Sequence, residues 1–342
     1  MAKAGPTAAP SIAGDPQEWL ADVLRERFAE VVSNSEAALS ESGVEGIHDM
    51  RVAIRRLRSM ISGFAGIAEK FPLKNVRKDL KRLADALGEV RDADVSIEAL
   101  RKLRDKADDE KVTTGIDIFI ERFRAQRAEA LEQLKPYLSS EYMGDLSAQF
   151  EKALKSSINQ RELFTVSNLA DAQGQIISNR VDDFRKLADA FYDPFSVKSL
   201  HRLRIAGKHL RYAIELFLPD LQTEAKDLAE SVAKMQTHLG EVHDHDVWIT
   251  EMRSGLTAKK GKELKGDERK AAEWLLARFV RRRSKSYKSA LELWSEWESS
   301  QILEDLRSIS VQTTELGKPV VKTDRPKLQS IKSKEPEVCD GR

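Results

Sequence analysis

The apolar positions of the chain recur at steps of three and four residues over most of its length, which predicts amphipathic helices. One such stripe runs from Leu20 to Val31 and another from Met50 to Ile61. No segment keeps the two-residue alternation that a half-buried strand requires. The pattern therefore predicts an all-α protein.

Glycine, proline and polar residues mark the predicted helix ends. In the first half, helices are predicted at residues 17–40, 48–71, 73–87, 95–104, 113–134 and 142–158. In the second half, they are predicted at residues 169–191, 196–217, 222–239, 245–256, 267–294 and 299–309. We expect residues 1–15 and the basic tail at 311–342 to be disordered, because they carry proline and polar residues without a core-forming pattern.

The helix that begins near residue 48 carries a row of basic side chains, which consists of His48, Arg51, Arg55 and Arg58. At about 100° per residue, these positions fall within roughly 80° of one another. The apolar stripe lies beside the row, so the helix packs on one side while the row stays accessible. Cations at this spacing repel one another, which indicates that an anion lies against them.

The same pattern occurs again 153 positions later, in a row that consists of His201, Arg204, Lys208 and Arg211. A second motif, Leu87-Gly-Glu-Val-Arg-Asp-Ala-Asp-Val95, recurs as Leu239-Gly-Glu-Val-His-Asp-His-Asp-Val247 after 152 positions. Two ordered matches at nearly one offset predict an internal duplication, with helical repeats at 16–160 and 161–310. A pseudo-two-fold arrangement of the repeats would bring the two rows together across one basic groove.

These paired motifs resemble those of the CHAD family, the conserved histidine α-helical domain. The resemblance rests on His-x-x-Arg-x-x-x-Arg/Lys-x-x-Arg followed by Leu-Gly-x-x-Arg/His-Asp-x-Asp-Val, in two copies, and covers roughly residues 16–310. It implies an all-helical, pseudo-two-fold fold around a basic central groove or pore. It also implies binding of inorganic polyphosphate and association with polyphosphate granules.

Further basic residues are candidates for the same site. Two pairs at matched positions, assigned to polyphosphate binding beside the rows, are Lys74 with Lys226 and Arg82 with Lys234. A third group is assigned to a supporting role or to the rim, and consists of Arg27, Arg91, Arg122, Arg127, Arg180, Arg278 and Arg283. Arginine suits phosphate oxygens because its planar fork donates two parallel hydrogen bonds.

The second motif admits two interpretations. In its second copy, His243, Asp244, His245 and Asp246 are of types that bind metals or act as acids and bases. The first copy has no histidine, and a metal site needs convergent ligands at set spacing. We therefore expect no metal, and we expect Asp92 and Asp244 to cap the next helix and to hold a groove arginine.

Composition narrows the classes of function. The 342 residues include 57 Lys and Arg and 56 Asp and Glu, a formal net charge of +1, which disfavours a nucleic-acid partner. The single cysteine, Cys339, permits no disulfide framework and suits a reducing cytoplasm. The sequence has neither a signal-peptide pattern nor an 18-residue apolar run, so we expect no membrane partner.

Two alternatives to a polyphosphate-binding protein stay open. One is a helical scaffold that recruits an acidic protein or nucleic acid through the same face. The other is a phosphohydrolase or phosphotransferase acting on polyphosphate, although the sequence has no Gly-x-Ser-x-Gly motif and no Walker loop. The leading expectation is a cytoplasmic polyphosphate-binding protein, associated with granules, that is not an enzyme and needs no cofactor.

Overall fold

The structure is a computed structural model, and it describes residues 16–39, 44–64, 73–158, 169–217, 223–258 and 263–315. These ranges are helical and contain no strand, which confirms the predicted all-α class. Residues 1–15 and most of the predicted tail lie outside the described residues. None of the described helices is long and apolar enough to cross a membrane.

The first half contains α1 (Pro16–Leu39), α2 (Val44–Phe64), α3 (Lys74–Arg104), α4 (Glu110–Leu134), the 3-10 helix η1 (Lys135–Leu138) and α5 (Ser140–Ile158). The second half contains α6 (Leu169–Arg185), the 3-10 helix η2 (Ala188–Tyr192), α7 (Val197–Phe217), α8 (Thr223–Leu256), α9 (Gly266–Ser300) and α10 (Ile302–Glu315). The order of shorter and longer helices is thus similar in both halves, while the internal duplication itself stays a prediction.

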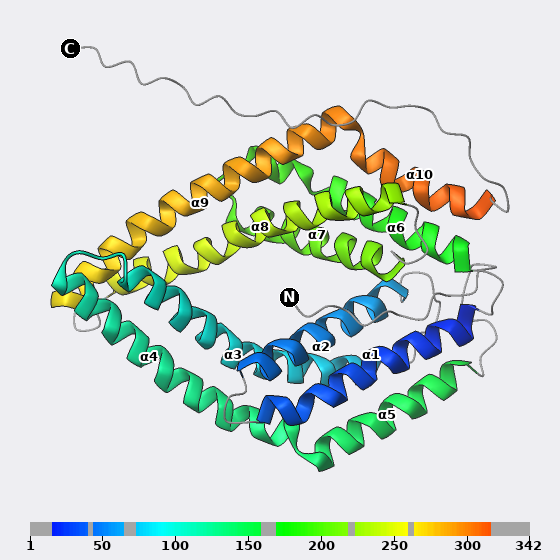
Figure 1. The fold of residues 1–342 in the computed structure, drawn as a ribbon, viewed down its shortest axis with the longest axis horizontal. Coiled ribbons are helices and arrows are strands. Elements are labelled where there is room, and N and C mark those ends of the chain that lie inside the picture. The colour runs from blue at the N-terminus through cyan, green and yellow to red at the C-terminus, as the bar shows by residue number, and fades with distance from the viewer. Residues whose placement is uncertain are drawn as a thin grey trace.

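The two halves lie opposite each other and meet at two places (Figure 1). α2 contacts α7 near the centre, and α4 contacts α9 at the end where the long helices converge. At that end a Cβ atom on Gly115 would lie only 2.2 Å from the carbonyl oxygen of Asp267, so glycine is required for the close approach of α4 and α9.

The apolar stripes form two buried clusters. The larger cluster joins both halves and includes Met50, Ile54 and Leu57 of α2, all of them fully buried. The smaller cluster fills the converging ends of α3, α4, α8 and α9. Burying one such side chain contributes about 1.5–3 kcal/mol, so the stripe fixes which face of α2 is left to carry the basic row.

α3 and α8 are each one continuous helix, whereas the sequence pattern predicted a break in both after Gly88 and Gly240. The buried positions Leu87 and Val90 continue the apolar stripe of α3 through the expected break. A helical glycine costs only about 1 kcal/mol relative to alanine, which packing of this kind offsets. The predicted capping role of Asp92 is therefore wrong, as is that of Asp244, because no helix begins there.

Two later helix ends also differ from the prediction. α9 runs to Ser300 instead of ending near residue 294, and it stops where Gln301 adopts a left-handed φ of 58°. α10 runs to Glu315, into the segment that was predicted as tail. In α9 the buried Trp297 lies beyond the expected end and extends the helical stripe.

Candidate anion-binding site

Where α2 and α7 pack together, positive charges of the α2 row lower the pKa values of side chains in the α7 row. Burial, followed by the charge of Arg204, lowers the pKa of Lys208 to about 8. Arg55 and Arg51 of the other half lower the pKa of Lys208 further. The same two arginines, after burial, lower the pKa of Arg204. We call Arg51, Arg55, Arg204 and Lys208 the cationic junction.

Two guanidinium groups of the cationic junction have unused donors. The Nε atoms of Arg55 and Arg204 are buried without a hydrogen-bond partner in the described part of the chain. The Arg55 guanidinium lies 5.8 Å from the ring centroid of Tyr212 on α7, which holds it between the halves by a weak cation–π contact. A buried donor without a partner costs about 1–3 kcal/mol, so an anion that accepted these hydrogen bonds would be stabilised.

Arg51 lies against α3 at the second motif. Its Nη2 donates to Oδ1 of Asp92 at 3.5 Å, a long and weak hydrogen bond. Its Nη1 occupies space that a side chain at residue 88 would need, because a Cβ on Gly88 would lie 2.4 Å away. Gly88 and Asp92 of the motif thus both position Arg51: Gly88 leaves room for its guanidinium group, and Asp92 accepts a hydrogen bond from it.

The row histidines begin each row and face the second motif. Nδ1 of His201 lies 3.2 Å from Nδ1 of His243 on α8, so one of the two rings donates. Burial and then Arg204 lower the pKa of His201, and the same causes lower that of His243 to about 4. In the first half Arg91 stands at the position of His243, and after burial it lowers the pKa of His48. The lowered pKa values favour neutral rings in the free protein, and an anion bound beside them would raise these pKa values.

His243 is a contact that the sequence analysis did not assign to the site. The motif was interpreted as the start of a new helix, and its histidines were considered only as metal ligands or as acids and bases. The match of His243 to Arg91, already assigned as supporting, was the available signal. In the described part of the chain no three His, Cys, Asp or Glu side chains are arranged to hold a metal.

The far ends of the rows are partly neutralised. Burial lowers the pKa of Arg58, while Asp85 of α3 raises it and Arg77 lowers it. Arg211 donates from Nε to Oε1 of Glu215 at 2.6 Å and from Nη1 to Oε1 of Gln236 at 3.1 Å. Acidic groups also offset part of the charge of the cationic junction, since burial lowers the pKa of Arg204 but Asp244 raises it, and Asp92 accepts a hydrogen bond from Arg51.

Of the two matched lysine and arginine pairs, Arg82 is the member whose described contacts place it away from the cationic junction. Arg82 is exposed, donates to Oδ1 of Asp79 at 3.2 Å, and acts on Tyr142 of α5, so it lies on the α5 side of α3. Lys226 and Lys234 are exposed on α8. Lys74 begins α3, but its side chain is not among those described.

Two of the predicted supporting arginines form buried ion pairs with the last aspartate of each motif. Arg127 donates from Nε to Oδ1 of Asp94 at 2.5 Å, which joins α4 to α3. Arg283 donates from Nε to Oδ1 of Asp246 at 2.6 Å, which joins α9 to α8. The aspartate side chains are only 8% and 7% exposed. These matched pairs hold the scaffold around the junction.

The other supporting arginines also make contacts within the scaffold. Arg122 bonds Glu268 at 2.5 Å between α4 and α9, and Arg278 stacks 3.7 Å over the ring centroid of Trp274. Arg27 bonds Glu30 at 2.5 Å within α1. Arg180 donates from Nη2 to the carbonyl oxygen of Ser62 at 3.1 Å, linking α6 to α2.

The fold and its junction define a class of protein, an all-helical molecule whose two halves present cations toward each other. The model of the CHAD domain family matches residues 22–253, and the chain belongs to the CHAD family. This finding confirms the resemblance that the paired motifs indicated.

Solved structures show the same fold. The CHAD domain from the plant Ricinus communis is similar with a TM-score of 0.65 and 20% identity, over 84% of this chain and 95% of that chain. PptA from Streptomyces chartreusis is similar with a TM-score of 0.61 and 14% identity, over 82% of this chain and 99% of that chain. A comparison with curated proteins gave no match.

Proposed function

We propose that the protein binds inorganic polyphosphate at the cationic junction, and that it acts by binding alone, without a cofactor. The observation that carries the proposal is the gathering of four cations from both halves, close enough that Arg51 and Arg55 lower the pKa values of Arg204 and Lys208. Such an arrangement costs free energy in the unliganded protein, and a polyanion removes that cost.

A linear polyphosphate suits this charge distribution better than a compact anion. Each row is about 15 Å long, so one orthophosphate covers only part of it, whereas a chain can contact both rows. Arginine forks recognise phosphate oxygens bidentately, and the histidines can donate once protonated. We also propose, on the same basis, a cytoplasmic location at polyphosphate granules, because the binding site would concentrate the protein there.

Titrations of the purified protein with long-chain polyphosphate, orthophosphate and RNA test the proposal. We expect long polyphosphate to bind far more tightly per molecule than orthophosphate, and more tightly than RNA at equal salt. Equal affinity for polyphosphate and orthophosphate would contradict an extended site. Preference for RNA would favour the scaffold alternative, and release of phosphate from polyphosphate would favour an enzyme.

Replacing Gly88 with alanine is expected to weaken polyphosphate binding without destabilising the fold. The new Cβ displaces the Arg51 guanidinium from α3, and the affinity falls by about 0.5–1.5 kcal/mol, the net value of a typical hydrogen bond. Gly240→Ala is the matched control, because no atom lies within 4 Å of its added Cβ. Both variants should gain up to about 1 kcal/mol of helix stability. Thermal melts measure the stability of the two variants, and titrations measure their affinity for polyphosphate. Equal affinity of the two variants would contradict the role of Gly88.

The affinity for polyphosphate is expected to fall as the pH rises above about 8. Lys208 has its pKa lowered to about 8 by burial and by neighbouring arginines in the free protein. A bound polyanion favours the ammonium form and raises this pKa, so Lys208 takes up a proton on binding when the pH is above about 8 and is already protonated well below it. Lys208→Arg, which stays charged, should lose this pH dependence. An identical slope in the wild type and Lys208→Arg would show that Lys208 does not contact the ligand.

A further inference from the structure

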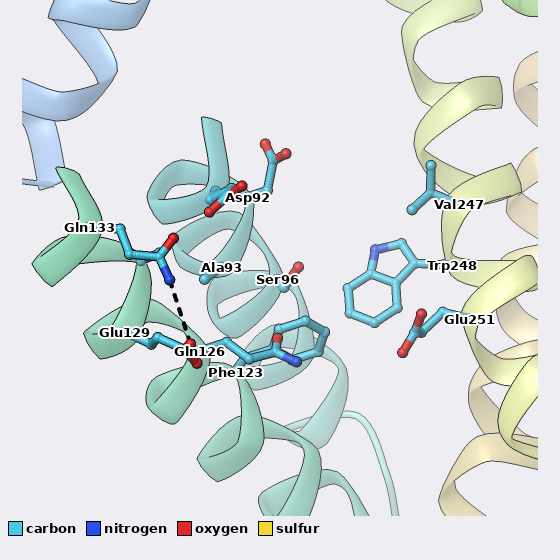
Figure 2. Close-up of a pocket in the computed structure, with 12 residues that line it drawn as sticks. Asp92, Ala93, Ser96, Phe123, Gln126, Glu129, Gln133, Val247, Trp248 and Glu251 are labelled. Atoms are coloured by element: carbon cyan, nitrogen blue, oxygen red, sulfur yellow. Dashed lines mark hydrogen bonds between the residues drawn. The ribbon is translucent and has the colours of Figure 1, made fainter. Parts of the chain in front are cut away.

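A cavity of about 540 Å³ lies between the two halves, beside the cationic junction. α3 and α4 form one wall and α8 forms the other (Figure 2). The ionisable side chains that line it are all acidic, and they are Glu89, Asp92, Glu129 and Glu251. The net charge of the whole chain is only +1, yet the cavity lining carries acidic groups alone. Its charge is thus opposite in sign to that of the cationic junction.

Two aromatic rings that line the cavity, one from each wall, are in contact. Phe123 of α4 and Trp248 of α8 meet edge to face, with ring centroids 5.7 Å apart and planes at 72° (Figure 2). Trp248 is also stacked on Phe279, with centroids 5.0 Å apart and planes at 11°. This stacking fixes the indole in place. Aromatic rings attract cations and cover methylene groups, so the wall suits a ligand that has both.

Two of the lining carboxylates have weak partners. Asp92 accepts from Arg51 at 3.5 Å, and Glu129 accepts from Nε2 of Gln133 at 3.5 Å (Figure 2). Hydrogen bonds of this length are weak and are readily replaced. These oxygens can therefore accept stronger, charge-assisted hydrogen bonds from an ammonium group.

The acidic groups are spread around the cavity and do not converge. The described residues contain no cluster of three side chains that could hold a metal ion, and divalent cations require several converging oxygen ligands. Separated carboxylates around an aromatic wall instead match a ligand whose charges are separated by methylene groups. We infer that this cavity binds an aliphatic polyammonium ion of the polyamine class. The inference does not rest on polyphosphate binding.

Calorimetric titration of the full chain with spermidine, in the absence of polyphosphate, tests the inference. We expect saturable binding of one spermidine, weaker binding of 1,4-diaminobutane, and no binding of the uncharged 1,4-butanediol. Glu129→Gln and Glu251→Gln should each weaken spermidine binding about two- to fivefold, the range of an exposed ion pair. Trp248→Leu should weaken it further.

Glu230→Gln is the matched control, because Glu230 is exposed on α8 and lies outside the cavity lining. It should leave the spermidine affinity unchanged. Because Trp248 packs on Phe279, the glutamine variants decide the result if Trp248→Leu fails to fold. Three results would overturn the inference: no saturable binding, equal weakening by Glu230→Gln, or binding of Mg²⁺ as tight as that of spermidine at equal ionic strength.

Discussion

Replacing Arg55 and Lys208 together with glutamine is expected to weaken polyphosphate binding by about 2–6 kcal/mol, or at least about 30-fold. Each single change should cost about 1–3 kcal/mol, the range of a charge-assisted hydrogen bond. The two side chains come from different halves and act on each other. If one polyphosphate chain contacts both, the double variant should lose at least the sum of the single losses.

The fold of these variants should stay intact, because removing a cation from the junction relieves repulsion in the free protein. Thermal melts beside titrations of both single variants and the double variant measure the two effects separately. Lys102→Gln is the control, since Lys102 is exposed and paired with Glu98 far along α3. A lowered melting temperature with wild-type affinity would assign the rows to scaffolding instead.

Replacing Asp246 with asparagine is expected to destabilise the fold by about 3–5 kcal/mol. Asp246 is the buried partner of Arg283, and the change leaves the guanidinium charge without its carboxylate. Arg283 also donates from Nη2 to the carbonyl oxygen of Pro194 at 2.7 Å, so it cannot turn to solvent without losing a second hydrogen bond.

Urea unfolding measures this loss. Glu292→Gln breaks the exposed ion pair with Lys288 and should change the free energy of unfolding by less than about 1 kcal/mol. Asp94→Asn should fall between these two variants, because Arg127 is more exposed than Arg283. If Asp246→Asn is as stable as Glu292→Gln, the matched ion pairs do not hold the long helices together.

The helical class could be predicted because the apolar spacing alone decides it. Met50, Ile54 and Leu57 are buried where the three- and four-residue steps place them. The continuity of α3 and α8 was missed because glycine and aspartate were given more weight than the unbroken stripe. Glycine and polar residues mark a helix end only where the buried apolar stripe also ends. Val90 is buried, so the stripe of α3 continues beyond Gly88.

The sequence predicted only those features of the site that follow from the spacing of residues along a single helix. Spacing along α2 and α7 assigns the basic residues to a face, but it does not identify their partners. The Arg127–Asp94 and His201–His243 contacts join residues 33 and 42 positions apart. A chain with so many charged residues offers many such pairings, and only the tertiary packing selects among them. Arg82 illustrates the limit, because its charge recurs at the matched position while its side chain lies toward α5.

The unbroken course of α3 constrains how this protein can change. Asp92 contacts Arg51 of α2, and two residues later Asp94 contacts Arg127 of α4. A loop between Gly88 and Asp92 could absorb an inserted residue, but within a helix one insertion turns everything beyond it by about 100°. Both carboxylates would then miss their arginines at once. Substitutions can accumulate around this motif, whereas insertions and deletions within it should be eliminated by selection.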